Sequence, residues 1–223
     1  MSDRSQIGLR ARDHFEELWG LGDPWSIETS EFEQGKYDLE LELLKGRRYG
    51  RVLELGCGNG AFTRRLSTIA DNVLAVDIAE SAIERTKELR FDGASVEFRV
   101  SNFMEWDFNE QEPWDLITLG DTISCLGWLY TFLDIACLAA ELFTANAPGG
   151  RLLLADACTH QLGSTFRPWV IRSYRDVFRN VGYELEREET YRGVKQGLEL
   201  EALLSVFRKP PEDAREREQA LWQ

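Results

Sequence analysis

One short segment, residues 52–61, limits the possible folds of this chain more than any other. It reads Val-Leu-Glu-Leu-Gly-Cys-Gly-Asn-Gly-Ala, an apolar strand that turns through three glycines into a helix. Glycine lets a backbone adopt conformations that a side chain forbids, and it lets the backbone come close to a ligand. Taken alone, the segment is either a tight strand-to-helix turn or the ligand-binding loop of an α/β domain.

The rest of the chain repeats the order of strand and helix. From residue 50 onward, short apolar runs alternate with helical patterns, which is typical of βαβ units and a parallel sheet. Strands are expected over residues 51–55, 73–77, 96–100, 116–119 and 151–156. Helices are expected over residues 61–68, 80–89, 131–145 and 168–180.

The last two strands, expected over residues 183–190 and 198–207, should pair differently. Only residues 191–197 separate them, which is too short for a crossover helix, so we expect an antiparallel hairpin at the sheet edge. Two amphipathic helices, over residues 3–19 and 28–44, precede the sheet. The predicted fold is therefore α/β: a doubly wound, mostly parallel seven-stranded sheet with a C-terminal antiparallel hairpin.

Charge and hydropathy exclude several kinds of partner. The net charge of −13 would repel a phosphate backbone, so no nucleic acid is expected. The longest apolar stretch, residues 126–142, is interrupted by Asp134 and Glu141 and is shorter than the roughly 20 residues that span a bilayer. The charged N-terminal segment does not look like a signal peptide. We expect a cytoplasmic protein with no membrane partner, and the oligomeric state stays open.

An acid follows the glycine turn at the spacing of a nucleoside site. Asp77 ends the next expected strand, 21 residues after Gly56, where a carboxylate can accept both hydroxyls of a ribose. The glycines and the acid together favour a nucleoside site over an incidental aspartate. However, Gly56-x-Gly58-x-x-Ala61 also satisfies the dinucleotide pattern, so the motif leaves NAD(P) open.

Three features favour S-adenosylmethionine over a dinucleotide. Glu54 precedes the glycines, where a carboxylate can hold an ammonium group and would repel a pyrophosphate. The only Tyr-x-x-x-Lys match for a hydride-handling pair, Tyr191 and Lys195, falls in the expected hairpin turn with Gly193 inside it. A terminal antiparallel hairpin is also an unusual ending for a dinucleotide domain.

With these residues in place, the chain resembles class I S-adenosylmethionine-dependent methyltransferases. More narrowly, over residues 20–208 it is similar to the nodulation-protein-S (NodS-like) family of small-molecule N-methyltransferases. The matching segments are Asp23-Pro24-Trp25, Glu31-Phe32-Glu33 with Tyr37, and residues 54–63, 75–78, 114–117 and 147–152.

The resemblance implies a set of cofactor-binding residues. In such enzymes Glu54, Gly56 and Gly58 would cradle the methionine part, Asp77 would hold the ribose and Ile78 would flank the adenine. The family usually has an acid after the third strand that meets the adenine amino group, and Asn102 stands there with a carbonyl that can accept the same hydrogen bond. The remaining implied contacts are Cys57, Phe103 and Gly120, with Trp25 and Tyr37 in an N-terminal lid.

The resemblance also divides the chain. Residues 1–46 would form the helical lid, residues 47–209 the S-adenosylmethionine-binding catalytic domain, and residues 210–223 a charged tail. Trp25 serves equally well as an anchor for helix packing, and that alternative stays open.

Candidate catalytic residues follow the fourth and fifth strands. Asp121 is the first choice for a base or an orienting group, because residues 119–121 turn directly into the expected pocket; the alternative is a helix N-cap. Asp156 and His160 are rivals that also follow a strand end. Cys158 and His160 form only a Cys-x-His pair, so no metal site is expected.

The sequence thus predicts methyl transfer from S-adenosylmethionine to a small-molecule acceptor. An amine is favoured over a hydroxyl, and an amino sugar fits because the nodulation relatives methylate an amino group on a glucosamine oligosaccharide. Two alternatives stay open: an NAD(P)-binding oxidoreductase, and a non-catalytic protein that binds S-adenosylmethionine.

Overall fold

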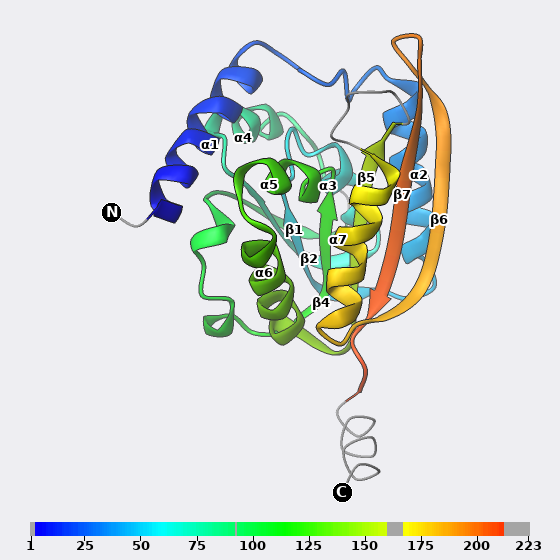
Figure 1. Cartoon of the computed structure of the whole chain (residues 1–223). Helices are drawn as coiled ribbons and strands as arrows, with labels where there is room; N and C mark the ends of the chain where they lie inside the picture. Colours follow the sequence, from blue (N-terminus) through cyan, green and yellow to red (C-terminus); the bar gives the residue numbers. More distant parts are fainter. Residues whose placement is uncertain (1–2, 92, 160–166, 212–223) are drawn as a thin grey trace, which may run out of the picture.

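A seven-stranded sheet with helices on both faces forms the body of the protein (Figure 1). The computed structural model describes residues 3–91, 93–159 and 167–211. The strand order is β3-β2-β1-β4-β5-β7-β6, with β7 antiparallel to β5 and β6 antiparallel to β7, while the other neighbours are parallel. The predicted fold is confirmed. The strands are β1 (Tyr49–Leu55), β2 (Ala70–Asp77), β3 (Ser95–Val100), β4 (Trp114–Gly120), β5 (Asn146–Cys158), β6 (Glu184–Lys195) and β7 (Leu198–Arg208).

The helices divide between the two faces of the sheet. On one face, α2, α3 and α4 pack with the C-terminal end of α1 against a cluster that includes Val52, Val73 and Leu153. On the other face, α5, α6 and α7 and two short 3-10 turns cover a second cluster. The helices are α1 (Asp3–Gly20), α2 (Glu31–Leu44), α3 (Ala61–Leu66), α4 (Glu80–Thr86), α5 (Ile123–Leu129), α6 (Phe132–Ala145) and α7 (Pro168–Asn180), with turns η1 (Phe103–Glu105) and η2 (Phe108–Glu110).

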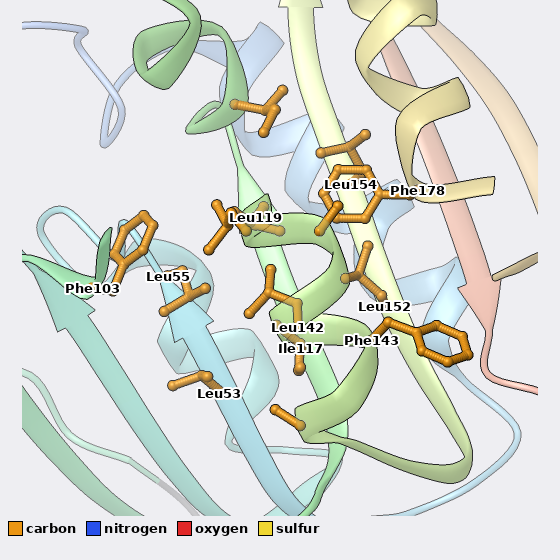
Figure 2. Packing of buried hydrophobic residues seen from close by; sticks show 14 of the residues in the cluster. Leu53, Leu55, Phe103, Ile117, Leu119, Leu142, Phe143, Leu152, Leu154 and Phe178 are labelled. Atoms are coloured by element: carbon orange, nitrogen blue, oxygen red, sulfur yellow. The ribbon is translucent and has the colours of Figure 1, made fainter. Parts of the chain in front are cut away.

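The second cluster shows how successive side chains of a strand alternate between the two faces of the sheet. Figure 2 shows Leu142 and Phe143 of α6 over the sheet, with Phe178 of α7 beside Leu154. Leu53 and Leu55 of β1 belong to this cluster, whereas Val52 belongs to the opposite one. Because successive side chains in a strand alternate between faces, Glu54 lies on the same face as Val52, beneath α3.

The hairpin differs from the prediction in its length. Strand β6 continues to Lys195, so the connection to β7 is the two-residue turn Gln196-Gly197, with φ of 53° and 78°. Two consecutive positive φ angles are typical of the tight type I′ turn, whose twist matches that of the strands. The prediction of a seven-residue connection was therefore wrong, and Tyr191 and Lys195 lie in a strand.

Two other elements also differ from the expectation. Helix α5 follows β4 directly and was not predicted, because its seven residues are too few to show a clear helical period. Helix α2 begins at Glu31, three residues later than expected, after Ser30 accepts a hydrogen bond from the N–H of Glu33 at 3.4 Å. Of the expected charged tail, residues 212–223 lie outside the described residues.

Two glycines bring α2 unusually close to the hairpin. A Cβ atom on Gly35 of α2 would lie 2.1 Å from the hydroxyl oxygen of Tyr191, and one on Gly193 of β6 would lie 3.0 Å from the ring of Phe32. The rings of Phe32 and Tyr191 lie 5.4 Å apart. Helix α2 therefore lies against the edge of the sheet formed by β7 and β6, as Figure 1 also shows.

Candidate functional site

A cavity of about 340 Å³ lies at the carboxyl ends of the central strands. The ends of β1, β2, β4 and β5 form the floor of the cavity. Helices α1 and α2 and the linker between them form the wall opposite this floor. The strand order reverses between β1 and β4, and open α/β sheets bind ligands at that switch point. The position of the cavity is therefore that of a ligand site.

The glycine turn at the end of β1 forms one wall of the cavity. Gly56, Gly58 and Gly60 have φ of 80°, 52° and 79°, which side chains rarely tolerate. A Cβ on Gly56 would lie 2.3 Å from the hydroxyl of Thr122, and one on Gly58 would lie 2.8 Å from the ring of Trp19. Glycine is therefore required at this turn both by the backbone and by the space around it.

Asp77 connects the glycine turn to the end of β2. One of its carboxylate oxygens accepts the N–H of Gly58 and the other accepts the N–H of Ala79, both at 2.9 Å. Burial raises the pKa of the Asp77 carboxyl, and the backbone hydrogen bonds partly oppose that rise. Asp77 also lines the cavity, so its carboxylate lies where it was predicted to accept the ribose hydroxyls. The same carboxylate fixes the glycine turn.

Glu54 lies behind the glycine turn and is not among the described residues that line the cavity. Its carboxylate accepts a hydrogen bond from the hydroxyl of Thr63 of α3 at 2.5 Å. Burial raises the pKa of Glu54 to about 8, although the hydrogen bond from Thr63 partly opposes this. In this arrangement Glu54 supports the turn through α3, and its predicted contact with a cofactor ammonium stays a prediction.

The other residues predicted to bind the cofactor do line the cavity. Asn102 caps η1 by accepting the N–H of Met104 at 3.2 Å, and its amide group donates to the hydroxyl of Tyr130 at 3.4 Å. The structure brings these predicted residues together around the cavity: Trp25, Tyr37, Gly56, Cys57, Gly58, Asp77, Ile78, Asn102, Phe103 and Gly120.

Trp25 and Tyr37 each combine packing with a place at the cavity. The ring of Trp25 lies edge-on to Trp19 at 5.3 Å, and the ring of Tyr37 stacks on Phe62 at 5.6 Å. The two interpretations of Trp25 are thus compatible, because one face can pack while another faces a ligand.

Asp121 has an unusual backbone and two fixed contacts. Its φ of 50° lies in the left-handed region, which is strained for a residue with a side chain and is often found at functional sites. One carboxylate oxygen accepts the N–H of Ala157 at 2.9 Å, and the other pairs with Lys36. The cap residue of α5 is Thr122, so the alternative of Asp121 as an N-cap was wrong. The side chain of Asp121 is 36% exposed and lines the cavity.

A chain of alternating charges extends from Asp121 along α2 to the hairpin. Lys36 pairs with Asp121 and also with Glu33, at 2.7 Å, and Glu33 pairs with Lys195 of β6. Burial opposes the charge on Lys36, but the negative groups around it, Asp121 first, more than offset that effect and raise its pKa. We call these four residues, Lys195, Glu33, Lys36 and Asp121, the ionic chain.

Glu40 adjoins the ionic chain but has a different environment. It is fully buried, and neither carboxylate oxygen has a hydrogen-bond partner among the described residues. Burial raises the pKa of Glu40 well above its usual value. Burial without a hydrogen-bond partner disfavours the charged form of this carboxyl, and the nearby charge of Lys36 only partly opposes that effect.

Most of the ionic chain was not predicted from the sequence. The signal was present in α2, where Glu33, Lys36, Tyr37 and Glu40 recur at positions i, i+3, i+4 and i+7, the spacing of one helix face. These residues are buried, although such a polar stripe usually faces water. The partners of the stripe are distant in the sequence: Asp121 follows β4, and Lys195 belongs to β6.

The two rivals of Asp121 have different outcomes. Asp156 is fully buried below the cavity, where its carboxylate accepts hydrogen bonds from the N–H and hydroxyl of Ser124. It is not among the described residues that line the cavity. His160 lies outside the described residues.

The described residues offer neither a metal site nor a membrane-spanning helix. Within residues 3–91, 93–159 and 167–211, no group of three or more His, Cys, Asp or Glu side chains is placed to hold a metal ion. Among the helices that the structure describes, none is long and apolar enough to cross a membrane.

This sheet order, with a glycine turn and a strand-end acid facing a cavity at the switch point, defines the class I S-adenosylmethionine-dependent methyltransferase fold. The chain matches the family model described as nodulation protein S (NodS) over residues 10–144. Because the match covers more than half of the chain, the protein belongs to the nodulation protein S family.

Individual relatives agree with this assignment. Nodulation protein S of Rhizobium tropici is 28% identical over 155 residues, which are 67% of this chain and 63% of that protein. Phosphoethanolamine N-methyltransferase 3 of Arabidopsis thaliana is 30% identical over 129 residues, which are 56% of this chain and 25% of that protein. The chain thus spans less than two thirds of the length of these relatives.

The fold agrees with a solved structure. N-methyltransferase NodS from Bradyrhizobium japonicum WM9, in complex with S-adenosyl-l-homocysteine, superposes with a TM-score of 0.73 at 20% sequence identity. The superposition covers 90% of this chain and 98% of that one.

Proposed function

We propose that this protein transfers a methyl group from S-adenosylmethionine to an amine on a small molecule. The observation that carries the proposal is the cavity at the switch point, which the glycine turn and Asp77 face from one side and Asp121 from the other. Membership in the nodulation protein S family supports it, since that family consists of S-adenosylmethionine-dependent methyltransferases.

The cofactor half of the cavity fits a nucleoside with an amino-acid tail. Gly56 and Gly58 leave room for close approach by the tail, and Asp77 offers carboxylate oxygens to the ribose. The side chains proposed to surround the adenine are Ile78, Asn102 and Phe103. Trp25 and Tyr37, on the wall formed by the N-terminal helices, are proposed to cover the bound cofactor.

The cofactor, when bound, would supply an electrophilic methyl group. An acceptor that arrives as an ammonium would first give a proton to the Asp121 carboxylate or to water. Its nitrogen lone pair would then form the new N–C bond as the S–C bond breaks, and the electron pair of the S–C bond would stay on sulfur. The protein's own residues would align the acceptor with the methyl group and would attract it while it is still an ammonium ion. Asp121 is proposed for this task, because Lys36 and the N–H of Ala157 fix its carboxylate while part of it faces the cavity.

An amine is preferred to a hydroxyl for two reasons. A fixed carboxylate attracts an ammonium group and can orient it or accept its proton, whereas a neutral hydroxyl gains less from it. The relatives named above include an N-methyltransferase of phosphoethanolamine, and the solved NodS is also an N-methyltransferase. An amino sugar remains a member of the proposed acceptor class.

Calorimetry provides the first test of the proposal. S-adenosylhomocysteine should bind in the micromolar range and NAD and NADP should not, and thermal stability should rise with the bound ligand. Binding of NADP without any response to S-adenosylhomocysteine would support the oxidoreductase alternative. That alternative already lacks its expected residues, because Lys195 is paired with Glu33 and Tyr191 packs on Phe32.

Methyl transfer provides the second test. The protein should methylate at least one member of a panel of amines and hydroxyl compounds when given labelled S-adenosylmethionine. If S-adenosylhomocysteine binds tightly and no member of a broad panel is ever labelled, the protein is a non-catalytic cofactor-binding protein.

A further inference from the structure

The cavity extends well beyond the part assigned to the cofactor. Asp77 lies at the end of β2 and Lys195 at the end of β6, which are near opposite edges of the sheet, and both line the cavity. If the cofactor occupies the half beside β1 and β2, the half beside β5, β7 and β6 remains for the acceptor. Lys195 and Leu200 of the hairpin line that second half together with Cys158.

Lys195 is the only Lys, Arg or His among the described residues that line the cavity. The pleat of β6 turns Tyr191, Gly193 and Lys195 toward α2, and the neighbouring Val194 is exposed on the opposite side. The side chain of Lys195 is 15% exposed, so its ammonium is largely removed from bulk water and yet reaches the cavity.

Lys195 can leave its partner Glu33 at a low cost in free energy. Glu33 is held between two lysines, with one oxygen on Lys195 and the other on Lys36 at 2.7 Å. If Lys195 turned to a ligand, Glu33 would keep Lys36, so no carboxylate would be left buried and unpaired. By contrast, Lys36 is fully buried and bridges two carboxylates, so its role is structural.

We propose that Lys195 binds a negatively charged group on the methyl acceptor, so that the acceptor is an amine that also carries an acidic group. Asp121 receives the amine at one end of the ionic chain, and Lys195 receives the anion at the other. The two lysines and two carboxylates of the chain balance one another, and an acceptor with one positive and one negative group preserves that balance. The inference rests on the proposed function, because it assigns the first half of the cavity to the cofactor.

The test uses amines in matched pairs, ethanolamine with phosphoethanolamine and glucosamine with glucosamine 6-phosphate. Calorimetry measures the binding of each compound to the full chain, with and without saturating S-adenosylhomocysteine. The wild type should bind the acidic member of at least one pair about 10-fold more tightly or better, as expected for a charge-assisted contact. Lys195→Met should bring that ratio close to one, and Lys195→Arg should keep most of it.

A matched control is Lys87→Met, which removes a lysine from an exposed pair with Glu84 and should leave the ratio at its wild-type value. Equal binding within every pair, no binding of either member, or a ratio that survives in Lys195→Met would overturn the proposal. A loss of S-adenosylhomocysteine affinity in Lys195→Met, with 5′-methylthioadenosine unaffected, would also overturn it, since the anion would then be the cofactor's carboxylate. Methylation of any panel amine would still uphold the proposed function in each of these cases.

Discussion

The half of the cavity proposed for the cofactor, beside β1 and β2 (the cofactor half), and the half proposed for the acceptor, beside β5, β7 and β6 (the acceptor half), are built in different ways. In the cofactor half, backbone groups make the important contacts: Asp77 accepts the N–H of Gly58, 19 residues away, and the N–H of Ala79. In the acceptor half, side-chain charges make them, and they join distant segments: Lys36 to Asp121 across 85 residues and Lys195 to Glu33 across 162. The first half depends on a local motif, and the second depends on the whole fold.

The largest effect should come from the centre of the ionic chain. Lys36→Met should lower the free energy of unfolding by about 3–5 kcal/mol, because it leaves Asp121 and Glu33 without the buried cation that pairs them. Urea unfolding followed by circular dichroism measures the change.

The exposed pair of Lys87 and Glu84 again offers the control. Lys87→Met should change stability by no more than about 1 kcal/mol, since exposed pairs contribute little. If Lys36→Met costs no more than this control, the ionic chain does not hold α2 on the sheet.

The next largest effect concerns methyl transfer. Asp121→Asn should lower the rate of methyl transfer to an amine substrate by about 10²-fold or more, because the amide of asparagine cannot attract an ammonium group or accept its proton. S-adenosylhomocysteine should bind nearly as tightly as before, which would place the loss in the acceptor half.

Two further variants compare the rivals of Asp121. Asp156→Asn and His160→Ala should each cost less than Asp121→Asn. Near-normal turnover in all three would mean that catalysis rests on positioning alone, and the assignment of Asp121 would be wrong.

The contrast between the halves explains what the sequence could predict. The glycine turn and Asp77 lie within one βαβ unit, so motif and spacing were enough to bring them together. Strand β4 was expected over residues 116–119 and forms over Trp114–Gly120. It was predictable because its residues form a clear apolar run. The general fold followed from such local patterns.

The ionic chain could not be predicted in this way. The spacing in α2 shows that Lys36 shares a helix face with Glu33, but a lysine on a helix is normally solvated. The spacing therefore does not indicate that Lys36 is buried and paired with Asp121, which follows β4. The hairpin turn was hidden for a related reason: Gln196 adopts a positive φ that its residue type rarely signals. Both features depend on partners or backbone states that become visible only in the assembled fold.

A third prediction addresses the cofactor half. Asp77→Ala should weaken binding of S-adenosylhomocysteine by roughly 10- to 100-fold, as expected for the loss of hydrogen bonds to a charged acceptor. The ratio of binding within the matched amine pairs should stay unchanged, because Lys195 lies in the other half. A folded Asp77→Ala protein with an unaltered dissociation constant would remove Asp77 from the site.

The last effect, which is spread over several pH units, tests a feature that both halves share. Burial raises the pKa of Glu54, below the cofactor half, to about 8, and burial followed by the charge of Asp121 raises the pKa of Asp156, below the acceptor half, to about 8. In the unfolded chain both carboxyls ionise near pH 4. The folded state therefore holds protons that the unfolded state has already lost between these pH values.

The sign of the pH dependence follows from that difference. Each group contributes stability that is fully present below about pH 4 and is lost as the pH rises toward 8, at about 1.4 kcal/mol per pH unit at most. Glu54→Gln and Asp156→Asn should each flatten the fall in unfolding free energy between pH 5 and pH 8, as measured by urea unfolding at four pH values. Asp121→Asn should reduce the contribution of Asp156 and leave that of Glu54 unchanged, because the charge of Asp121 raises the pKa of Asp156, and also that of Glu40, but does not act on Glu54. Curves for Glu54→Gln that run parallel to those of the wild type would mean that Glu54 is already ionised in the folded protein, and a carboxylate would then stand ready behind the cofactor half.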